Sequence, residues 1–512
     1  MANKPARNAT EEKAQAFSPC APPADAAGKR TVQSYIDETP EWADCTRVAG
    51  APMTQMQWRI WGLATAGKFF EGLVVFMTGV ALPLIVMEFG LTATQKGVVS
   101  AAVLFGILVG ASALGGLADH YGRKRMFIVE MGIFTGFLIL LTLSGSYLWL
   151  VVCMFGMGTA LGCDYPTAHM VISESIPSRN RGRLVLSAFA FQAIGALVGS
   201  FVGYLILYEN PAIGAWRWMY ATAIIPAILV IFGRFYICDS AHWLVSRGRR
   251  EEAERVILRL LNRRPQYPKE AYLFDPQAES GNDEKPGTLR GYAELFSRKN
   301  LRATVFAAVP WFLQDLGTYG IGIFTPTILA EAIGHKVNYA RNLADIIHND
   351  ILGAKGAAML DVLLIVGIIF AIFLTDKVGR VRLQVVGFLG CATGLALAAL
   401  STNFQGYTQI LFLFSGFMLF NFMTNMGPNS QTYLLAGEVF PTHIRGKGAG
   451  FAASFAKIGA VTTAFLFPIL LKDIGTHILL LILVGTSVAG ALITWSFRIE
   501  TTGINLEEVG RS

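Results

Sequence analysis

The sequence predicts an all-α membrane protein with twelve transmembrane helices in two pseudo-symmetric six-helix bundles. The composition is one reason, because only 15% of the 512 residues are charged and 53% are hydrophobic, whereas soluble chains are about 25% charged. A second reason is a series of apolar segments, each roughly 20 residues long, which is enough to cross a bilayer. A third is a pair of charged motifs that recur in both halves, which indicates an internal duplication.

Six apolar segments lie in each half of the chain. They cover about 60–88, 95–118, 126–145, 148–172, 184–207 and 217–237 in the first half, and about 302–330, 355–375, 383–401, 409–435, 449–471 and 476–497 in the second. The predicted organisation is an N-terminal tail (1–57), a first bundle (58–238), a linker (239–300), a second bundle (301–498) and a C-terminal tail (499–512).

The tail and the linker are the polar parts of the chain. Residues 1–57 are rich in Ala and Pro, and no apolar run follows Met1, so we expect a disordered or partly ordered tail and no cleavable signal peptide. The linker contains "SRGRREEAERVILRLLNRR" (246–264), whose pattern predicts amphipathic surface helices that are too polar to span a bilayer.

The loop charges predict the orientation. Lys and Arg are concentrated after the second, fourth, eighth and tenth segments, and such loops face the cytoplasm. Both termini are therefore expected in the cytoplasm, with the chain in the plasma (inner) membrane. The same distribution explains the net charge of +7 without a nucleic-acid partner. The expected partners are the lipid bilayer and a small anionic substrate, and we expect a monomer.

Several functional classes find no support. The six Cys are scattered without a spacing typical of disulfides or zinc sites. No nucleophile constellation, metal cluster or cofactor loop indicates an enzyme, so we expect neither a metal nor another cofactor. The chain has no phosphate-binding loop of an ATPase, so an ion gradient or the gradient of the substrate must drive any transport. Buried carboxylates favour protons.

Two motifs occur twice. "SESIPSRNRG" (173–182) shares its Glu, Pro, Arg and Gly spacing with "GEVFPTHIRG" (437–446), and "GGLADHYGRKR" (115–125) matches "IFLTDKVGRVR" (372–382). Both pairs lie about 260 residues apart, as parallel repeats of one transporter half would. We predict two cytoplasmic gating clusters, Asp119, Arg123, Glu174 and Arg181 in the first half and Asp376, Arg380, Glu438 and Arg445 in the second. Ordinary solvated loop charges are the alternative.

Ionisable side chains within the apolar segments indicate the functional site, because each is costly in a bilayer without a partner or a function. Asp164 lies deep in the fourth segment. Burial favours the neutral form of a carboxylic acid, so we predict Asp164 as a proton carrier; a structural, hydrogen-bonded Asp is the alternative. His169 could contact substrate, relay a proton or simply pack.

Other polar residues suggest an anion site. Trp311, Asp315 and Tyr319 are spaced four apart and share a helix face, although Trp and Tyr at this spacing also pack. Lys68 and Glu71 are three apart in the first segment, close enough to pair. Two ammonium groups, on Lys68 and Lys457, suggest an anionic substrate, with Asn425, Asn429 and Gln192 as neutral hydrogen-bonding groups. Internal ion pairs without a ligand are the alternative for both lysines.

The motifs resemble those of the major facilitator superfamily. "GGLADHYGRK" is similar to its loop signature, and "DSAHWLVSRGRREEA" (239–253) resembles the segment after the sixth helix in the sugar-porter-like branch. Within the superfamily, "GCDYPTAHMVISESIPSRNRGRLVLSAFAFQAIG" (162–195), "WFLQDLGTYG" (311–320) and "MGPNSQTYLLAGEVFPTHIRG" (426–446) resemble the phosphate:proton symporter family. That resemblance implies phosphate binding by Tyr165, Gln192, Trp311, Asp315, Tyr319, Asn429 and Lys457.

The chain also departs from the phosphate:proton pattern. "GKFFEGLVVF" (67–76) has Glu71 and Val74 where the family's first helix has Asp, and Thr318 precedes the Tyr where an aromatic is usual. The predicted function is proton-coupled symport of a small anion by alternating access, with inorganic phosphate first. The alternatives are an organic anion, a sugar and, last, a non-transporting receptor. Asp164, Glu71 and Asp315 are the predicted proton-coupling residues, and Lys68 joins the predicted substrate-binding set.

Overall fold

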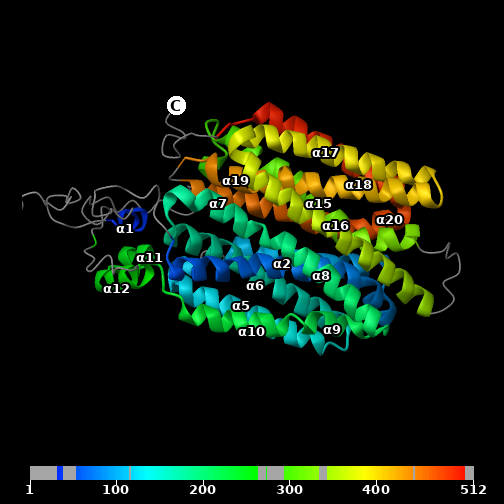
Figure 1. Cartoon of the computed structure of the whole chain (residues 1–512), viewed down its shortest axis with the longest axis horizontal. Coiled ribbons are helices and arrows are strands. Elements are labelled where there is room, and N and C mark those ends of the chain that lie inside the picture. Colours follow the sequence, from blue (N-terminus) through cyan, green and yellow to red (C-terminus); the bar gives the residue numbers. More distant parts are fainter. Residues whose placement is uncertain are drawn as a thin grey trace, which may run out of the picture.

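The computed structural model describes residues 31–38, 53–114, 117–262, 273, 293–333, 343–441 and 444–501. The regular elements of these residues are helices, most of them aligned along the long axis of the molecule (Figure 1). The helices are apolar around most of their circumference, as expected where neighbouring helices and lipid surround them. The all-α membrane fold predicted from the sequence is confirmed.

The described part of the first bundle consists of six helical segments, some of them made of consecutive helices. They are formed by α2 (Gln55–Phe89), α3 (Ala93–Val109) continued by a π-helical turn η1 (Gly110–Leu114) and α4 (Leu117–Tyr121), α5 (Arg123–Thr142), α6 (Tyr147–Ser175), α7 (Ser178–Phe189) continued by α8 (Phe191–Glu209), and α9 (Ala215–Ala221) continued by α10 (Ile224–Tyr236).

The second bundle repeats this arrangement. It consists of α15 (Leu301–Ile333), α16 (Leu343–Val378), α17 (Arg380–Leu400) followed by the 3₁₀ turn η2 (Ser401–Asn403), α18 (Tyr407–Met426) continued by α19 (Pro428–Glu438), and α20 (Arg445–Phe497). Gly475 has a φ of 74° inside α20, a backbone conformation that glycine adopts readily and that ends a helix. The break divides α20 into the last two predicted spans.

The spans agree with the sequence prediction. Ten helical stretches in the described part of the chain are long and apolar enough to cross a membrane. Dividing α20 at Gly475 adds one span. Helix α15 supplies another, since its 33 residues exceed the length that a bilayer requires. Its polar residues, among them Gln314 and Asp315, belong to the site described below.

The duplicated loops have the same backbone conformation. Gly122, before α5, has φ 100° and ψ 147°, and Gly379, before α17, has φ 94° and ψ 148°. Side chains other than that of glycine are strained in this region. Two equivalent glycines in one unusual conformation give structural support to the duplication that the motifs indicated.

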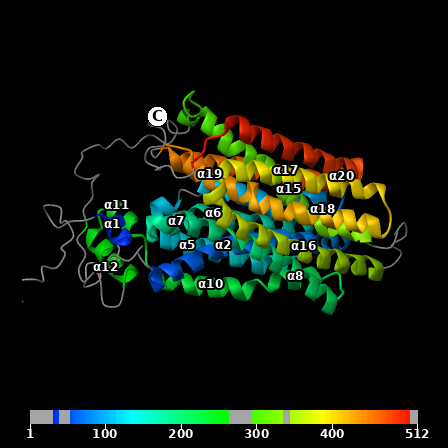
Figure 2. The same ribbon diagram turned by 45° about the horizontal axis from the view of Figure 1, so that its top comes forward.

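The bundles meet along one seam. The pairs α2 and α15, α3 and α20, and α8 and α16 pack against each other across it. Figures 1 and 2 show the first bundle, in blue to green, lying alongside the second, in light green to red, with α8 and α16 adjacent in both views. This seam contains the charged side chains of the candidate site.

The predicted tail and linker contain ordered helices. Helices α1 (Val32–Asp37), α11 (Ala241–Ser246) and α12 (Arg250–Leu260) form a cluster beyond one end of the bundles, here called the α12 end (Figures 1 and 2). Helix α12 is amphipathic as predicted, with Ala253, Ile257 and Leu260 buried. Helix α1 lies within the predicted tail, and α2 begins at Gln55, slightly before the predicted boundary.

Candidate functional site

Lys457 and Glu71 form the centre of the seam. The Lys457 ammonium on α20 lies 3.2 Å from Glu71 Oε1 on α2 and 3.5 Å from Asp315 Oδ2 on α15. Glu71 Oε2 lies 2.6 Å from the ammonium of Lys68. Three helices from two bundles therefore bring together two cations and two carboxylates, all little exposed to solvent.

Tyr319 and Gln192 complete this network. The Tyr319 hydroxyl donates to Glu71 Oε1 at 2.8 Å and accepts from Lys457 at 2.5 Å and from the Gln192 amide at 3.0 Å. The same amide lies 3.3 Å from Glu71 Oε1. Because α15 has 3.6 residues per turn, Asp315 and Tyr319 emerge one turn apart on the same face.

A small cavity of about 20 Å³ lies against this network. Its polar lining consists of residues predicted from the sequence, namely Lys68, Gln192, Trp311, Asp315, Tyr319, Asn429 and Lys457. The volume suffices for roughly one water molecule and is too small for a phosphate or a sugar. The structure therefore shows a closed state of the site.

Asp164 lies in the first bundle, beside this network. Its carboxylate Oδ1 is 2.6 Å from Nη1 of Arg234 on α10, and the Arg234 side chain has no exposure to solvent. The guanidinium also stacks 3.4 Å from the ring centroid of Phe127. Such a buried pair requires good geometry and further partners to offset desolvation, and the Phe127 carbonyl supplies one by accepting from Nη1.

Glu130 on α5 adds a second carboxylate to this pair. Its Oε1 accepts a hydrogen bond from the Thr167 hydroxyl at 2.9 Å, and its buried Oε2 has no hydrogen-bond partner within the described part of the chain. The charges of Glu130, Asp164 and Arg234 are close enough to interact. One guanidinium thus lies near two carboxylates in the interior of the first bundle.

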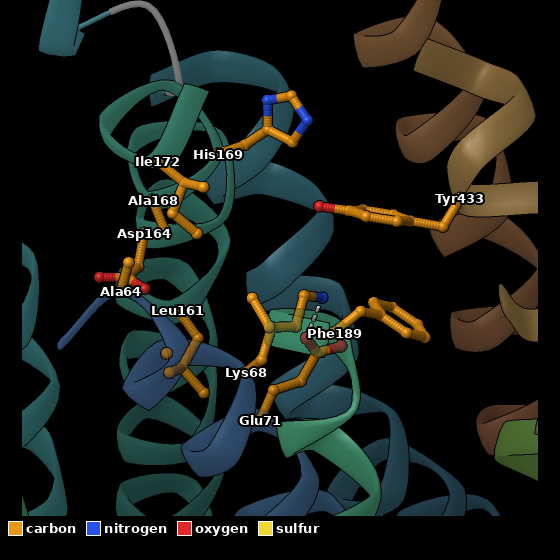
Figure 3. Close-up of a pocket in the computed structure, with 12 residues that line it drawn as sticks. Ala64, Lys68, Glu71, Leu161, Asp164, Ala168, His169, Ile172, Phe189 and Tyr433 are labelled. Carbon is orange, nitrogen blue, oxygen red and sulfur yellow. Dashed lines mark hydrogen bonds and ion pairs between the residues drawn. The ribbon is translucent and has the colours of Figure 1, made fainter. Parts of the chain in front are cut away.

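A second cavity, also of about 20 Å³, is lined by residues of both groups. Asp164, Lys68, Glu71, His169 and Tyr433 are among the residues that line it. Figure 3 shows Lys68 and Glu71 joined by their ion pair, with Tyr433 reaching toward the cavity from the opposite bundle. Since Lys68 lines both cavities, it stands between the proton-binding carboxylates and the central network.

Tyr433 closes the seam on the α12 side. Its ring stacks on Phe189 of the first bundle with centroids 4.8 Å apart, and it makes edge contacts with Trp311 and His169 at 6.2 Å. On the other side of the network, the Ser200 hydroxyl of α8 donates to Asp361 Oδ2 of α16 at 2.7 Å, again across the seam. Contacts on both sides explain why the cavities are small.

The duplicated motifs form two equivalent ion pairs at the α12 end. Arg123 binds Glu174 with both oxygens of the carboxylate, at 3.2 and 3.1 Å. Arg380 binds Glu438 in the same way, at 3.0 and 3.3 Å, and also lies 3.3 Å from Asp376. Each pair joins the start of one helix to the end of the next within one bundle. The gating role of these pairs stays a prediction.

Arg445 and Asn429, also predicted, form hydrogen bonds within the second bundle. The Arg445 guanidinium donates to the Phe440 carbonyl at 3.2 Å. Asn429 donates to Asn425 at 2.6 Å and lines the central cavity. The side chains of Tyr165, Asp119 and Arg181 lie outside the described residues.

Sequence reasoning missed Arg234, Glu130, Tyr433 and Asp361. Glu130 carried the same signal as Asp164, an ionisable residue inside an apolar segment. Arg234 lies near the end of its segment, where a basic residue is ordinary, and nothing in the sequence indicates that it points inward. The described residues contain no group of three or more His, Cys, Asp or Glu that could hold a metal ion.

Comparisons with known proteins indicate a transporter. The family described as "Sugar (and other) transporter" matches residues 53–512. The inner membrane metabolite transport protein YgcS of Escherichia coli K12 is 28% identical over 91% of this chain and 96% of its own. A Schizosaccharomyces pombe protein named as a candidate inorganic phosphate transporter is 25% identical over 90% and 89%.

A solved structure agrees with the fold. The proton:xylose symporter XylE from E. coli, a major facilitator superfamily protein, superposes with a TM-score of 0.69 at 20% identity, over 89% of this chain and 98% of XylE. At this identity the similarity concerns the fold. It confirms the predicted two-bundle architecture of the major facilitator superfamily.

Proposed function

The chain belongs to the sugar (and other) transporter family within the major facilitator superfamily, and we propose that it is a proton-coupled symporter of a small anion. Membership of this family makes it a multi-pass membrane transporter and not an enzyme. Inorganic phosphate is the first candidate substrate. The bundles alternate access to the seam, and the proton gradient supplies the driving force without a cofactor.

The charge balance of the central network is the observation that carries this proposal. Lys68 and Lys457 are matched by Glu71 and Asp315, all within a nearly closed seam. An added anion would leave an uncompensated negative charge in a poorly hydrated site, which is costly. Protonation of one carboxylate restores the balance. Anion binding and proton binding are therefore coupled.

The proton-binding residues follow from the same geometry. Asp164 and Glu130 share Arg234, and the cavity beside Asp164 is also lined by Lys68 and Glu71. We assign the first proton to the Asp164 and Glu130 pair. From there it reaches Glu71 or Asp315 when the anion enters.

Two facts support phosphate. Six of the seven residues that the family resemblance associates with phosphate, all but Tyr165, line one cavity, and they provide a lysine, a tyrosine, a tryptophan and two amide side chains as hydrogen-bond donors. A relative that matches most of the chain carries the name of a candidate phosphate transporter. The neutral sugar alternative is supported by the family description.

An organic carboxylate is the second candidate. Glu71 Oε1 accepts from Tyr319 and Lys457 in the closed site, so the donor set accommodates a carboxylate oxygen. This observation does not require a tetrahedral oxyanion.

Uptake into proteoliposomes tests these proposals. The purified chain is reconstituted, a pH gradient is imposed, and the accumulation of labelled phosphate is compared with that of benzoate, other carboxylates and glucose. We expect phosphate to accumulate only when the outside is acidic. Accumulation of glucose but of no anion would contradict anion symport, and uptake independent of the gradient would contradict proton coupling.

The orientation is also a proposal. Because basic loops favour the cytoplasmic side, we place the α12 end and both termini in the cytoplasm and the protein in the plasma membrane. Since one chain supplies the whole central network, we propose that a monomer is the working unit.

A further inference from the structure

Glu71 is bound by the groups that should bind the substrate. Its Oε1 lies within 3.3 Å of Lys457, Tyr319 and Gln192, and these three side chains also line the central cavity. Oε2 accepts a hydrogen bond from the ammonium of Lys68. One carboxylate of the protein thus engages both cations and two neutral donors of the candidate binding site.

The Glu71 carboxylate also connects the bundles. Glu71 belongs to α2 of the first bundle, whereas Tyr319 and Lys457 belong to α15 and α20 of the second. Asp315, the carboxylate in the same bundle as Lys457, is farther from its ammonium than Glu71 is, at 3.5 Å against 3.2 Å. Charge-assisted hydrogen bonds are stronger than neutral ones, so these contacts hold the bundles together.

The remaining space does not admit a substrate while Glu71 is in place, because the cavity holds roughly one water molecule. We propose that Glu71 is a tethered internal ligand, which occupies the anion site of the empty carrier, keeps the seam closed and must be displaced by the substrate. This inference rests on the proposed function, since it takes the central network as the anion site.

Displacement of Glu71 by the substrate gives the empty and the loaded carrier different contacts at the same site. A substrate anion takes the hydrogen bonds of Lys457, Tyr319 and Gln192, and the released Glu71 carboxylate keeps its contact with Lys68 or accepts a proton. When a ligand competes with an internal group, its apparent affinity equals its intrinsic affinity multiplied by the fraction of sites that are open. Removing the internal ligand should therefore raise the apparent affinity.

Two substitutions test the proposal. Glu71→Asp keeps the charge but shortens the side chain by one methylene, and Glu71→Gln keeps the length but removes the charge. The distance between the bundles is measured by electron spin resonance on the full chain without substrate. Spin labels are attached at Tyr236→Cys and Val378→Cys, in a background without the native cysteines. Both sites are exposed, and they lie at the α12 end of different bundles.

We expect both variants to show a broader and longer distance distribution than the unsubstituted chain. We also expect inorganic phosphate to bind about tenfold more tightly, as for a site freed from a competitor that occupies roughly nine-tenths of it. The matched control is Glu88→Asp, which shortens a carboxylate on the same helix whose partners, Arg217 and Trp216, lie in the same bundle. It should leave the distance unchanged.

Distance distributions identical to that of the unsubstituted chain in both variants would overturn the proposal, whatever the transport results. If Glu71→Gln does not fold, as judged by its melting temperature, Glu71→Asp decides the matter. Because the distance measurement requires no substrate, it stays informative if phosphate uptake fails. Phosphate uptake together with unchanged distances would rule out Glu71 as an internal ligand and leave the proposed function intact.

Discussion

The Asp164 carboxylate lies 2.6 Å from a guanidinium that has no contact with solvent, and the second carboxylate beside them, Glu130, has one oxygen without a partner within the described part of the chain. A buried group of one cation and two carboxylates can take up a proton without creating an isolated charge. At the scale of single residues, this group is the one to which we have assigned the first proton of the proposed transport cycle.

Replacing Asp164 with Asn should therefore abolish the stimulation of uptake by external acid. The amide keeps the size of the side chain but cannot bind the proton, so uptake should be slow and flat between about pH 5 and pH 8. The measurement is initial uptake of labelled phosphate into proteoliposomes at a series of external pH values. Acid-stimulated uptake like that of the unsubstituted chain would remove Asp164 from the proton pathway.

Stability must be measured beside transport in this variant. Removing one partner of a buried ion pair costs about 3–5 kcal/mol because the other charge stays buried. Asp473→Asn, which changes an exposed carboxylate of α20, is the matched control and should retain the acid stimulation. Loss of stimulation in both variants would point to the reconstitution and not to Asp164.

The sequence predicted much of the site because the bilayer makes polar residues conspicuous. Trp311, Asp315 and Tyr319 were expected on one face, and they line one cavity. What could not be predicted was which helices face one another. The attraction of Glu71 to Lys457 depends on the packing of α2 against α15 and α20, and the inward direction of Arg234 depends on the rotation of α10 about its axis.

At the scale of elements, each apolar segment corresponds to a helix because backbone groups inside a bilayer must satisfy their hydrogen bonds within the segment. The helix ends were less predictable. Gly427 lies between α18 and α19, and an added Cβ there would lie 2.5 Å from the Cα of Gly387 on α17. Such a close approach of two backbones is a property of the packing and not of the local sequence.

The two equivalent loop glycines provide a prediction at this scale. Gly122→Ala and Gly379→Ala should each destabilise the protein by about 1–3 kcal/mol, because the φ of 100° and 94° at these positions strains any residue with a Cβ. At Gly122 the new Cβ would also lie 3.1 Å from the Trp243 ring. Thermal unfolding in detergent measures the effect.

Gly132→Ala is the matched control. Gly132 lies within helix α5, and a Cβ there would meet open space. Because alanine favours helices by about 1 kcal/mol over glycine, this variant should unfold at the same or a higher temperature. Equal melting temperatures for all three variants would show that the loop conformation at Gly122 and Gly379 is not required for stability.

At the scale of the whole molecule, the two bundles contribute the same balance of charge to the central network. The second bundle contributes Lys457 and Asp315, and the first contributes Lys68 and Glu71. Each bundle thus brings one cation and one carboxylate to the seam. The central network is neutral when all four are ionised, and neither bundle contributes a net charge to it.

This neutrality predicts which gradient drives transport. If every negative charge of the substrate enters with one proton, the loaded and empty carriers have the same net charge. A membrane potential then does no work on either. In proteoliposomes, an imposed pH gradient alone should drive accumulation of phosphate, and a potassium diffusion potential set with valinomycin, at equal pH on both sides, should not.

Accumulation driven by the potential alone would mean that more protons than substrate charges cross together. The proton bound near Arg234 would then travel in addition to the one that neutralises the anion, and the balance of the four seam residues would no longer determine the stoichiometry.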